Sequence, residues 1–193
     1  AQEKIQYNPR ALESTIRLSS NENPYGPSKN VQQRIKNSFN HGCRYPYAYS
    51  DDLASILAKK HGVSEESIII TGGSTEGLRI TGLTFASNGG EIISGQPTFL
   101  AMMDYAKQWG ATINWVPVGA DKGYDLNEIE KRISSKTKLI FLCNPNNPTG
   151  TLVPARKLVD FCDSASKKTI VFSDEAYYDY IEKPNYPSMI SAV

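Results

Sequence analysis

Two short segments in the second half of the chain carry side chains that could hold a flat, nitrogen-containing ring. The first is the amide-rich turn at residues 144–150 (NPNNPTG), and the second is residues 173–177 (SDEAY). Amides and hydroxyls can hydrogen-bond an oxygen on one edge of such a ring, while a carboxylate beside a pyridine nitrogen keeps that nitrogen protonated. A protonated ring withdraws electrons, so this pair of segments suits chemistry in which a bond to a substrate carbon breaks.

Both segments follow short apolar runs that predict buried parallel strands. Residues 138–142 (KLIFL) precede the amide turn, and residues 169–172 (TIVF) precede Asp174. Open α/β sheets bind ligands at the carboxyl ends of their strands, which is where both segments would lie. Tyr177 could donate a hydrogen bond to the same ring as Asp174, and Pro148 restricts the backbone of Asn147 before it.

Each segment also has an ordinary interpretation. An apolar strand that ends in Asp-Glu could supply a Walker B carboxylate or a helix cap, and an Asn/Pro/Gly run is typical of a plain turn. No G-x-x-x-x-G-K-[ST] sequence occurs in the chain, so a nucleotide would lack its phosphate loop and the NTPase reading is disfavoured.

Residues 67–76 predict a second ligand-binding element. Residues 67–70 (SIII) read as a buried strand, and residues 71–76 (TGGSTE) turn the chain into a helix that begins near Ser74. Helix N-termini with free amides bind phosphate, and glycines let a ligand approach the backbone. The alternative is a strand-to-helix turn in which Ser74 is merely the N-cap.

Phe99 follows the strand predicted at residues 91–94 and precedes a helix predicted over residues 100–109. An aromatic side chain at such a junction can lie flat on a pyridine ring. The alternative is that Phe99 is a core residue.

Together these motifs resemble fold-type I pyridoxal-phosphate (PLP) enzymes of the class I and II aminotransferase group, closest to the histidinol-phosphate aminotransferase branch, from about residue 18 to the end. The resemblance implies that Asn147 and Tyr177 contact the phenolic oxygen of PLP and that Asp174 pairs with the ring nitrogen. It implies that Phe99 stacks on the ring, although this position often carries Tyr in the family. It also assigns the phosphate to the turn that contains Gly73, Ser74 and Thr75.

The N-terminal region resembles two further elements of that family. Residues 18–27 (LSSNENPYGP) predict an extended arm with a turn, and the family resemblance makes Asn23 and Tyr25 candidates for the substrate side. Residues 44–46 (RYP) resemble an element whose Tyr contacts the phosphate of the neighbouring subunit's cofactor. Tyr45 therefore implies a homodimer, with Tyr47 and Tyr49 as competing choices.

The resemblance implies a Schiff-base lysine several tens of residues beyond Tyr177 and a carboxylate-binding arginine downstream, and the sequence ends at Val193. We expect residues 1–30 to form an arm and residues 31–193 to form most of the PLP-binding large domain. The rest of the sheet and the small C-terminal domain would be absent, and this chain alone would be inactive.

The order of elements predicts an α/β fold, a mostly parallel sheet with helices on both faces that is incomplete. Strands expected near residues 67, 91, 112, 138 and 169 alternate with helices near 75, 100, 125 and 154. Helix starts are predicted at Ser28, Ser50, Asp125 and Pro154.

The resemblance implies a PLP-dependent aminotransferase that moves an amino group between an amino-acid or amino-phosphate donor, of the histidinol-phosphate type, and a 2-oxo acid. Two alternatives stay open. One is a PLP-dependent decarboxylase of a phosphorylated amino acid, and the other is a non-catalytic PLP-binding protein without the lysine.

Composition favours small-molecule substrates and a second subunit as partners. The 193 residues include 21 basic and 20 acidic side chains, whose charges nearly cancel. No basic stripe points to nucleic acid, and no apolar run is long enough for a membrane span.

Three cysteines without C-x-x-C spacing predict neither a metal site nor a disulfide framework, and Cys143 and Cys162 are expected to be buried thiols. We expect a cytoplasmic protein. The start at Ala1-Gln2 leaves export after signal-peptide removal as the alternative.

Overall fold

The computed structural model describes residues 18–192. The chain divides into two compact units, residues 1–46 and 47–193. The first unit contains α1 (Lys29–Ser38) and η2 (Phe39–His41). Ser28 caps α1 by accepting a hydrogen bond from Val31 N at 3.3 Å, as its position in the sequence predicts. Residues 1–17 of the expected arm lie outside the described residues.

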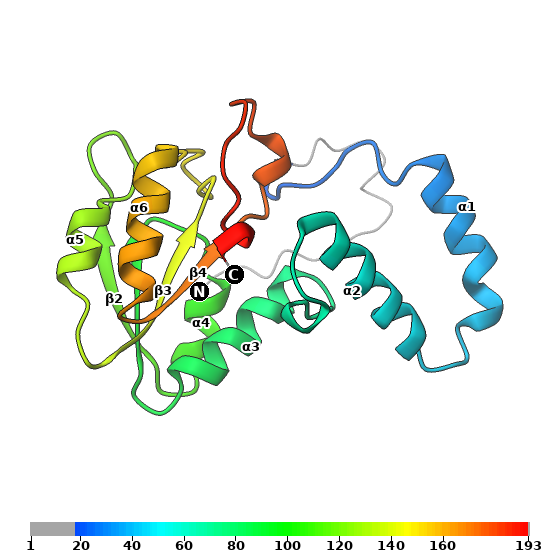
Figure 1. Ribbon diagram of the computed structural model, residues 1–193, viewed down its shortest axis with the longest axis horizontal. Helices are drawn as coiled ribbons and strands as arrows, with labels where there is room; N and C mark the ends of the chain where they lie inside the picture. Colours follow the sequence, from blue (N-terminus) through cyan, green and yellow to red (C-terminus); the bar gives the residue numbers. More distant parts are fainter. Residues whose placement is uncertain (1–17, 193) are drawn as a thin grey trace. The chain divides into compact units, whose positions relative to one another are not determined.

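The second unit is built around one parallel sheet in the order β2-β1-β3-β4. Figure 1 labels β2, β3 and β4 of this sheet. Its strands are β1 (Glu91–Gln96), β2 (Thr112–Pro117), β3 (Thr137–Cys143) and β4 (Ile170–Asp174). The helices of this unit are α2 (Tyr47–His61), α3 (Ser74–Ala86), α4 (Ala101–Lys107), α5 (Leu126–Lys131) and α6 (Ala155–Ser166). Short 3-10 turns complete it: η3 (Glu65–Ser67), η4 (Tyr178–Tyr180) and η5 (Met189–Ala192).

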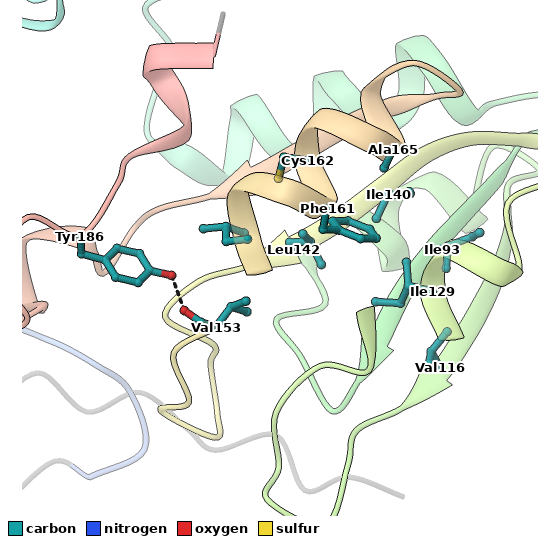
Figure 2. Close-up of a cluster of buried hydrophobic side chains, with 11 residues drawn as sticks. Ile93, Val116, Ile129, Ile140, Leu142, Val153, Phe161, Cys162, Ala165 and Tyr186 are labelled. Atoms are coloured by element: carbon teal, nitrogen blue, oxygen red, sulfur yellow. Dashed lines mark hydrogen bonds between the residues drawn. The ribbon is translucent and has the colours of Figure 1, made fainter. Parts of the chain in front are cut away.

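Alternating residues of the central strands pack against helices on opposite faces of the sheet. In β1, Ile92 joins a buried cluster with residues of α3 and α4, while Ile93 joins a second cluster with residues of α5 and α6. Figure 2 shows the second cluster, in which Phe161 of α6 gathers with Ile140 and Leu142 of β3. Burial on both faces explains why β3 reads as a continuous apolar run. The predicted α/β fold with a helix-covered parallel sheet is confirmed.

The connections that leave β1 and β3 run to opposite faces of the sheet. The chain after β1 enters α4 on one face, whereas the chain after β3 enters α6 on the other. Since β1 and β3 are neighbours, their carboxyl ends mark the topological switch point, where open α/β sheets bind ligands.

Two local predictions were wrong. The strand predicted at residues 67–70 does not form: Ser67 ends η3, residues 68–70 belong to no helix or strand, and Ile69 is 84% exposed. Their β-branched composition favours a strand, but a strand also needs a neighbour for its backbone hydrogen bonds, and none of the four strands in residues 18–192 pairs with them. Ser50 does not begin a helix, because α2 already starts at Tyr47.

The other helix starts are close to prediction. Asp125 is the N-cap of α5, and its Oδ1 accepts from Glu128 N at 2.9 Å. Pro154 is the residue directly before α6, one position earlier than expected. Within residues 18–192 the structure has no helix that is both long and apolar enough to cross a membrane.

Candidate functional site

Asn147 and Tyr177 meet where the loops after β3 and β4 come together. The side-chain amide Nδ2 of Asn147 donates to the hydroxyl of Tyr177 at 3.3 Å. Both side chains are half-buried. The structure thus brings together two of the residues singled out from the sequence, and a donor amide and a phenol lie at the same edge of the sheet.

Asp174 is the last residue of β4 and a buried carboxylate, with 7% of its surface exposed. Its Oδ1 accepts a hydrogen bond from Ala176 N at 3.2 Å, and none of the ion pairs within residues 18–192 includes it. Burial raises the pKa of Asp174 above its ordinary value, the Ala176 amide opposes this, and the charge of Glu175 adds to it. A buried carboxylate in this state is stabilised by a proton or by a cationic partner.

Glu175, the neighbour of Asp174, is used for structure. Its carboxylate accepts from Met189 N at 2.7 Å, from Ser188 Oγ at 2.6 Å and from Ser173 Oγ at 3.2 Å. These bonds tie Ser188 and the start of η5 to the end of β4. The two adjacent acids therefore have different environments: the Glu175 carboxylate accepts these three hydrogen bonds, whereas the Asp174 carboxylate accepts the one from Ala176 N.

Asn144 anchors the base of the amide turn. Its backbone N donates to the carbonyl of Asp174 at 2.9 Å, and its side chain donates to Tyr186 Oη at 2.8 Å and accepts from Val153 N at 2.9 Å. Tyr186 in turn donates to the Val153 carbonyl at 2.6 Å (Figure 2). The Nδ2 and the Oδ1 of Asn144 therefore each have a hydrogen-bond partner within the protein.

Asn146 anchors the middle of the same turn and is also buried. Its Oδ1 accepts from the hydroxyls of Thr98 and Tyr124, and its Nδ2 donates to the Pro97 carbonyl and to Thr149 Oγ1. The side chains of Asn144 and Asn146 thus bond to residues that hold the turn in place, whereas the side chain of Asn147 bonds to Tyr177 at the edge of the sheet.

The turn before α3 has a backbone suited to an anion. Gly73 is the N-cap residue with φ +88°, and Gly72 N donates to the carboxylate of Glu76. Ser74 makes no side-chain cap, so the reading of Ser74 as the N-cap was wrong. The amides of Ser74 and Thr75 lie in the first turn of α3, which offers them no intrahelical acceptor.

Phe99 is half-buried and packs against the cluster of buried residues that α3 and α4 contribute to. Part of the Phe99 side chain therefore packs in the core, as the alternative interpretation predicts. Its role in stacking stays a prediction.

Asn23, Tyr25 and Tyr45 belong to the first unit. Asn23 forms the predicted turn, since its Oδ1 accepts from Tyr25 N at 3.0 Å and its Nδ2 donates to the Gly26 carbonyl at 3.0 Å. Tyr25 and Tyr45 are 93% and 84% exposed. The substrate and subunit contacts of these residues stay predictions.

The cysteines near the sheet are buried, as expected. Burial raises the pKa of the Cys143 thiol and of the Cys162 thiol to about 11 each. Both thiols are therefore protonated at neutral pH and are poor nucleophiles. Residues 18–192 contain no group of three or more metal-ligating side chains placed to hold an ion.

Thr98, Tyr124 and Asn146 were missed as a group by the sequence reading. Asn146 was visible as part of an amide-rich turn, but nothing marked Tyr124, which precedes the helix cap Asp125 in an ordinary connection. Tyr124 reaches the carboxyl edge only because that connection packs over β1.

Comparison with known proteins gives a consistent result. The family model described as aminotransferase class I and II matches residues 13–192. A histidinol-phosphate aminotransferase of Caldicellulosiruptor saccharolyticus is 38% identical over 93% of this chain and 50% of its own length. This chain therefore spans about half the length of the curated relatives it matches.

Solved structures agree on the fold. A candidate histidinol-phosphate aminotransferase of Erwinia carotovora atroseptica is 28% identical, with a TM-score of 0.83 over 90% of this chain and 51% of its own. A histidinol-phosphate aminotransferase of Sinorhizobium meliloti, solved in complex with pyridoxal-5'-phosphate, is 24% identical, with a TM-score of 0.81 over 89% of this chain and 47% of its own, which speaks for the fold. With the family match over most of its residues and a parallel sheet of the same architecture, the chain belongs to the class I and II aminotransferases.

Proposed function

We propose that the protein to which this chain belongs is a PLP-dependent aminotransferase that moves an amino group from a donor of the histidinol-phosphate type to a 2-oxo acid. Membership of the aminotransferase family and the names of the relatives support this proposal. The observation that carries it is Asp174, a buried carboxylate without a cationic partner in residues 18–192, at the same sheet edge as the Asn147–Tyr177 pair.

Asp174 is suited to the nitrogen of a pyridinium ring. A protonated ring nitrogen would supply the cation that the buried carboxylate lacks, and the pairing would keep Asp174 ionised and the ring positive. PLP, when bound, acts as an electron sink for the bond that breaks at the substrate Cα. The contribution of Asp174 is to hold a proton on the nitrogen.

The remaining contacts are proposed residue by residue. Asn147 and Tyr177 would donate hydrogen bonds to the phenolic oxygen on the opposite edge of the ring, because both carry N–H or O–H groups at that point. Phe99 would stack on the ring face. The first-turn amides of α3, with Gly73, Ser74 and Thr75, would hold the phosphate.

The family resemblance also suggests roles for three residues of the first unit. We propose that Asn23 and Tyr25 line the approach to the site and that Tyr45 contacts the cofactor phosphate of a second copy in a homodimer. The division into an arm at residues 1–30 and a large domain from residue 31 onward is part of the same proposal.

The first experiment is intact mass after addition of PLP and reduction with borohydride, on this chain and on the full-length protein side by side. Reduction traps a lysine–PLP bond as a stable adduct. One site-specific adduct on the full-length protein supports the proposal. Its absence there would favour the non-catalytic binding protein instead.

A second assay separates transamination from decarboxylation. The full-length enzyme is incubated with histidinol phosphate, with aromatic amino acids and with a phosphorylated amino acid, each with and without a 2-oxo acid. Turnover that requires the 2-oxo acid supports the aminotransferase. Release of CO₂ without it would identify the decarboxylase.

A further inference from the structure

A polar cluster links the loops that follow β1 and β3, with Thr98 and Asn146 buried and Tyr124 half-buried. Tyr124 enters it from the connection between β2 and α5. Its hydroxyl lies 2.7 Å from Asn146 Oδ1 and 2.8 Å from Thr98 Oγ1, and it accepts a hydrogen bond from Cys143 N at 3.2 Å. Thr98 Oγ1 also lies 2.8 Å from Asn146 Oδ1. Three segments distant in the sequence therefore share one set of polar contacts.

The backbone of β1 is shaped to admit the Tyr124 ring. A Cβ atom added at Gly95 would lie 2.2 Å from Cδ1 and 2.3 Å from Cε1 of Tyr124. Only a residue without a side chain leaves space for the ring there. The pairing of β1 with β3 ends at Ser94 and Phe141, so the Tyr124 hydroxyl satisfies Cys143 N just beyond the ladder.

The direction of the hydrogen bonds follows from the surroundings. The Pro97 carbonyl can only accept, so Asn146 must turn Nδ2 toward it and Oδ1 toward the two hydroxyls. Burial raises the pKa of Tyr124 to about 12, which keeps its hydroxyl a donor at neutral pH. The hydroxyls of Tyr124 and Thr98 thus supply two protons for the three close oxygen pairs among Tyr124, Thr98 and Asn146.

The cluster joins Thr98 and Asn146. Each of them is next in sequence to a residue of the proposed cofactor site, and that site places one of these two residues on the face of the PLP ring and the other at its edge. Thr98 precedes Phe99, and Asn146 precedes Asn147. The loop of Phe99 leaves toward α4 and the loop of Asn147 toward α6, so no continuous element fixes the spacing between them.

We propose that Tyr124 is a positioning residue which, through Thr98 and Asn146, sets the spacing and relative orientation of Phe99 and Asn147. This inference rests on the proposed function, since the two residues are assigned to the face and the edge of PLP. Tyr124 would touch neither the cofactor nor the substrate.

The test uses full-length protein carrying Tyr124→Phe or Thr98→Val, both of which keep the packed volume and remove a hydroxyl. Tyr105→Phe is the matched control, because Tyr105 lies on α4 against Trp109 and Arg79 and makes none of the hydrogen bonds of the cluster. The readouts are hydrogen exchange of the cofactor-free protein, PLP affinity and visible circular dichroism of bound PLP, which reports a fixed ring orientation.

We expect Tyr124→Phe to exchange at Cys143 and across residues 144–151 at least tenfold faster than wild type. We also expect its PLP dissociation constant to rise about tenfold, the effect of losing a typical hydrogen bond. Its visible circular dichroism per bound PLP should fall by half or more. Thr98→Val should show the same changes in circular dichroism more weakly, and Tyr105→Phe should match wild type.

The outcomes are separable. Normal circular dichroism per bound PLP in a folded Tyr124→Phe protein would overturn the inference and leave the proposed function intact, even if stability fell, because a merely structural role lowers occupancy without reorienting the ring. Should Tyr124→Phe not fold, Thr98→Val decides by the same criterion. Absence of any PLP signal in wild type would remove the proposed function and the inference with it.

Discussion

Asn147 and Tyr177 are 30 positions apart in the sequence, and the amide of one donates to the hydroxyl of the other at 3.3 Å. The contact exists because β3 and β4 are parallel neighbours, paired to the last residues of both strands at Cys143 and Asp174. Two loops that leave one sheet edge are thereby held together, and three polar groups, from Asn147, Asp174 and Tyr177, gather at that edge.

Replacing Asn147 with Ala should change the titration of bound PLP in the full-length protein. An amide donor stabilises the anionic form of the phenolic oxygen, so its loss should raise the pH at which the visible absorption changes by about one unit, the effect of a hydrogen bond to a charged group. Absorption spectra across pH measure this. An unchanged titration would show that Asn147 does not contact that oxygen. Asn37→Ala, on α1, is the control for an exposed amide.

Asp174→Asn should lower the rate of transamination far more than the occupancy of PLP. The amide keeps the size of the side chain and the bond from Ala176 but removes the charge that, in the proposed site, would hold a proton on the ring nitrogen. We expect kcat to fall roughly 100-fold or more, as for other preorganised charges, with cofactor occupancy near wild type. Asp179→Asn, at an exposed position five residues on, is the matched control. Equal losses of rate and occupancy would make Asp174 a structural residue.

The same substitution should stabilise the cofactor-free protein near neutral pH. The folded state raises the pKa of Asp174 above 3.8, chiefly by burial. The stability associated with its protonated form is thus fully present below the unfolded pKa and is lost as pH rises through the folded pKa. Asp174→Asn should therefore match wild type near pH 3 and exceed it progressively at higher pH. Denaturant titrations over this range measure the difference, and a constant offset would contradict the assignment.

Gly73 and Gly62 allow backbone strain to be separated from ligand binding. Both have positive φ, +88° and +69°, and a Cβ at either would meet no atom within 4 Å. Ala at Gly62 should cost about 1–2 kcal/mol of stability through its left-handed backbone. Ala at Gly73, whose φ of +88° and ψ of 165° are adopted almost only by glycine, should cost about 1–3 kcal/mol. Only Gly73→Ala should also weaken PLP binding, because Gly73 is the N-cap of α3, directly before the amides of Ser74 and Thr75 that are proposed to hold the phosphate. Calorimetry of PLP binding to both variants makes the comparison, and equal affinities would argue against a phosphate site there.

Gly95→Ala should destabilise the protein by about 1–3 kcal/mol, the usual cost of overpacking, because the new methyl group meets the Tyr124 ring. In a Tyr124→Ala background the same change should cost much less. A double-mutant cycle from denaturant titrations measures this coupling. Additive effects would show that the ring does not pack on Gly95.

The sequence by itself determined the elements that depend on local patterning. The apolar run of β3 and the cap residues Ser28 and Asp125 were readable because burial on both faces and helix capping act over a few residues. The motifs at residues 144–150 and 173–177 also placed Asn147, Asp174 and Tyr177 at strand ends, since strand ends follow directly from strand positions.

Only the tertiary structure decided what depends on partners distant in the chain. Residues 68–70 have strand-like composition but no neighbouring strand within residues 18–192, and pairing, which no local pattern encodes, is what makes a strand. The three amides of the turn looked alike in sequence. In the structure, Asn144 and Asn146 form hydrogen bonds with Tyr186 and Tyr124, whereas Asn147 forms one with Tyr177. Hydrogen bonds between side chains require both groups to be positioned by the sheet, so the fold chose among residues that the sequence could only group together.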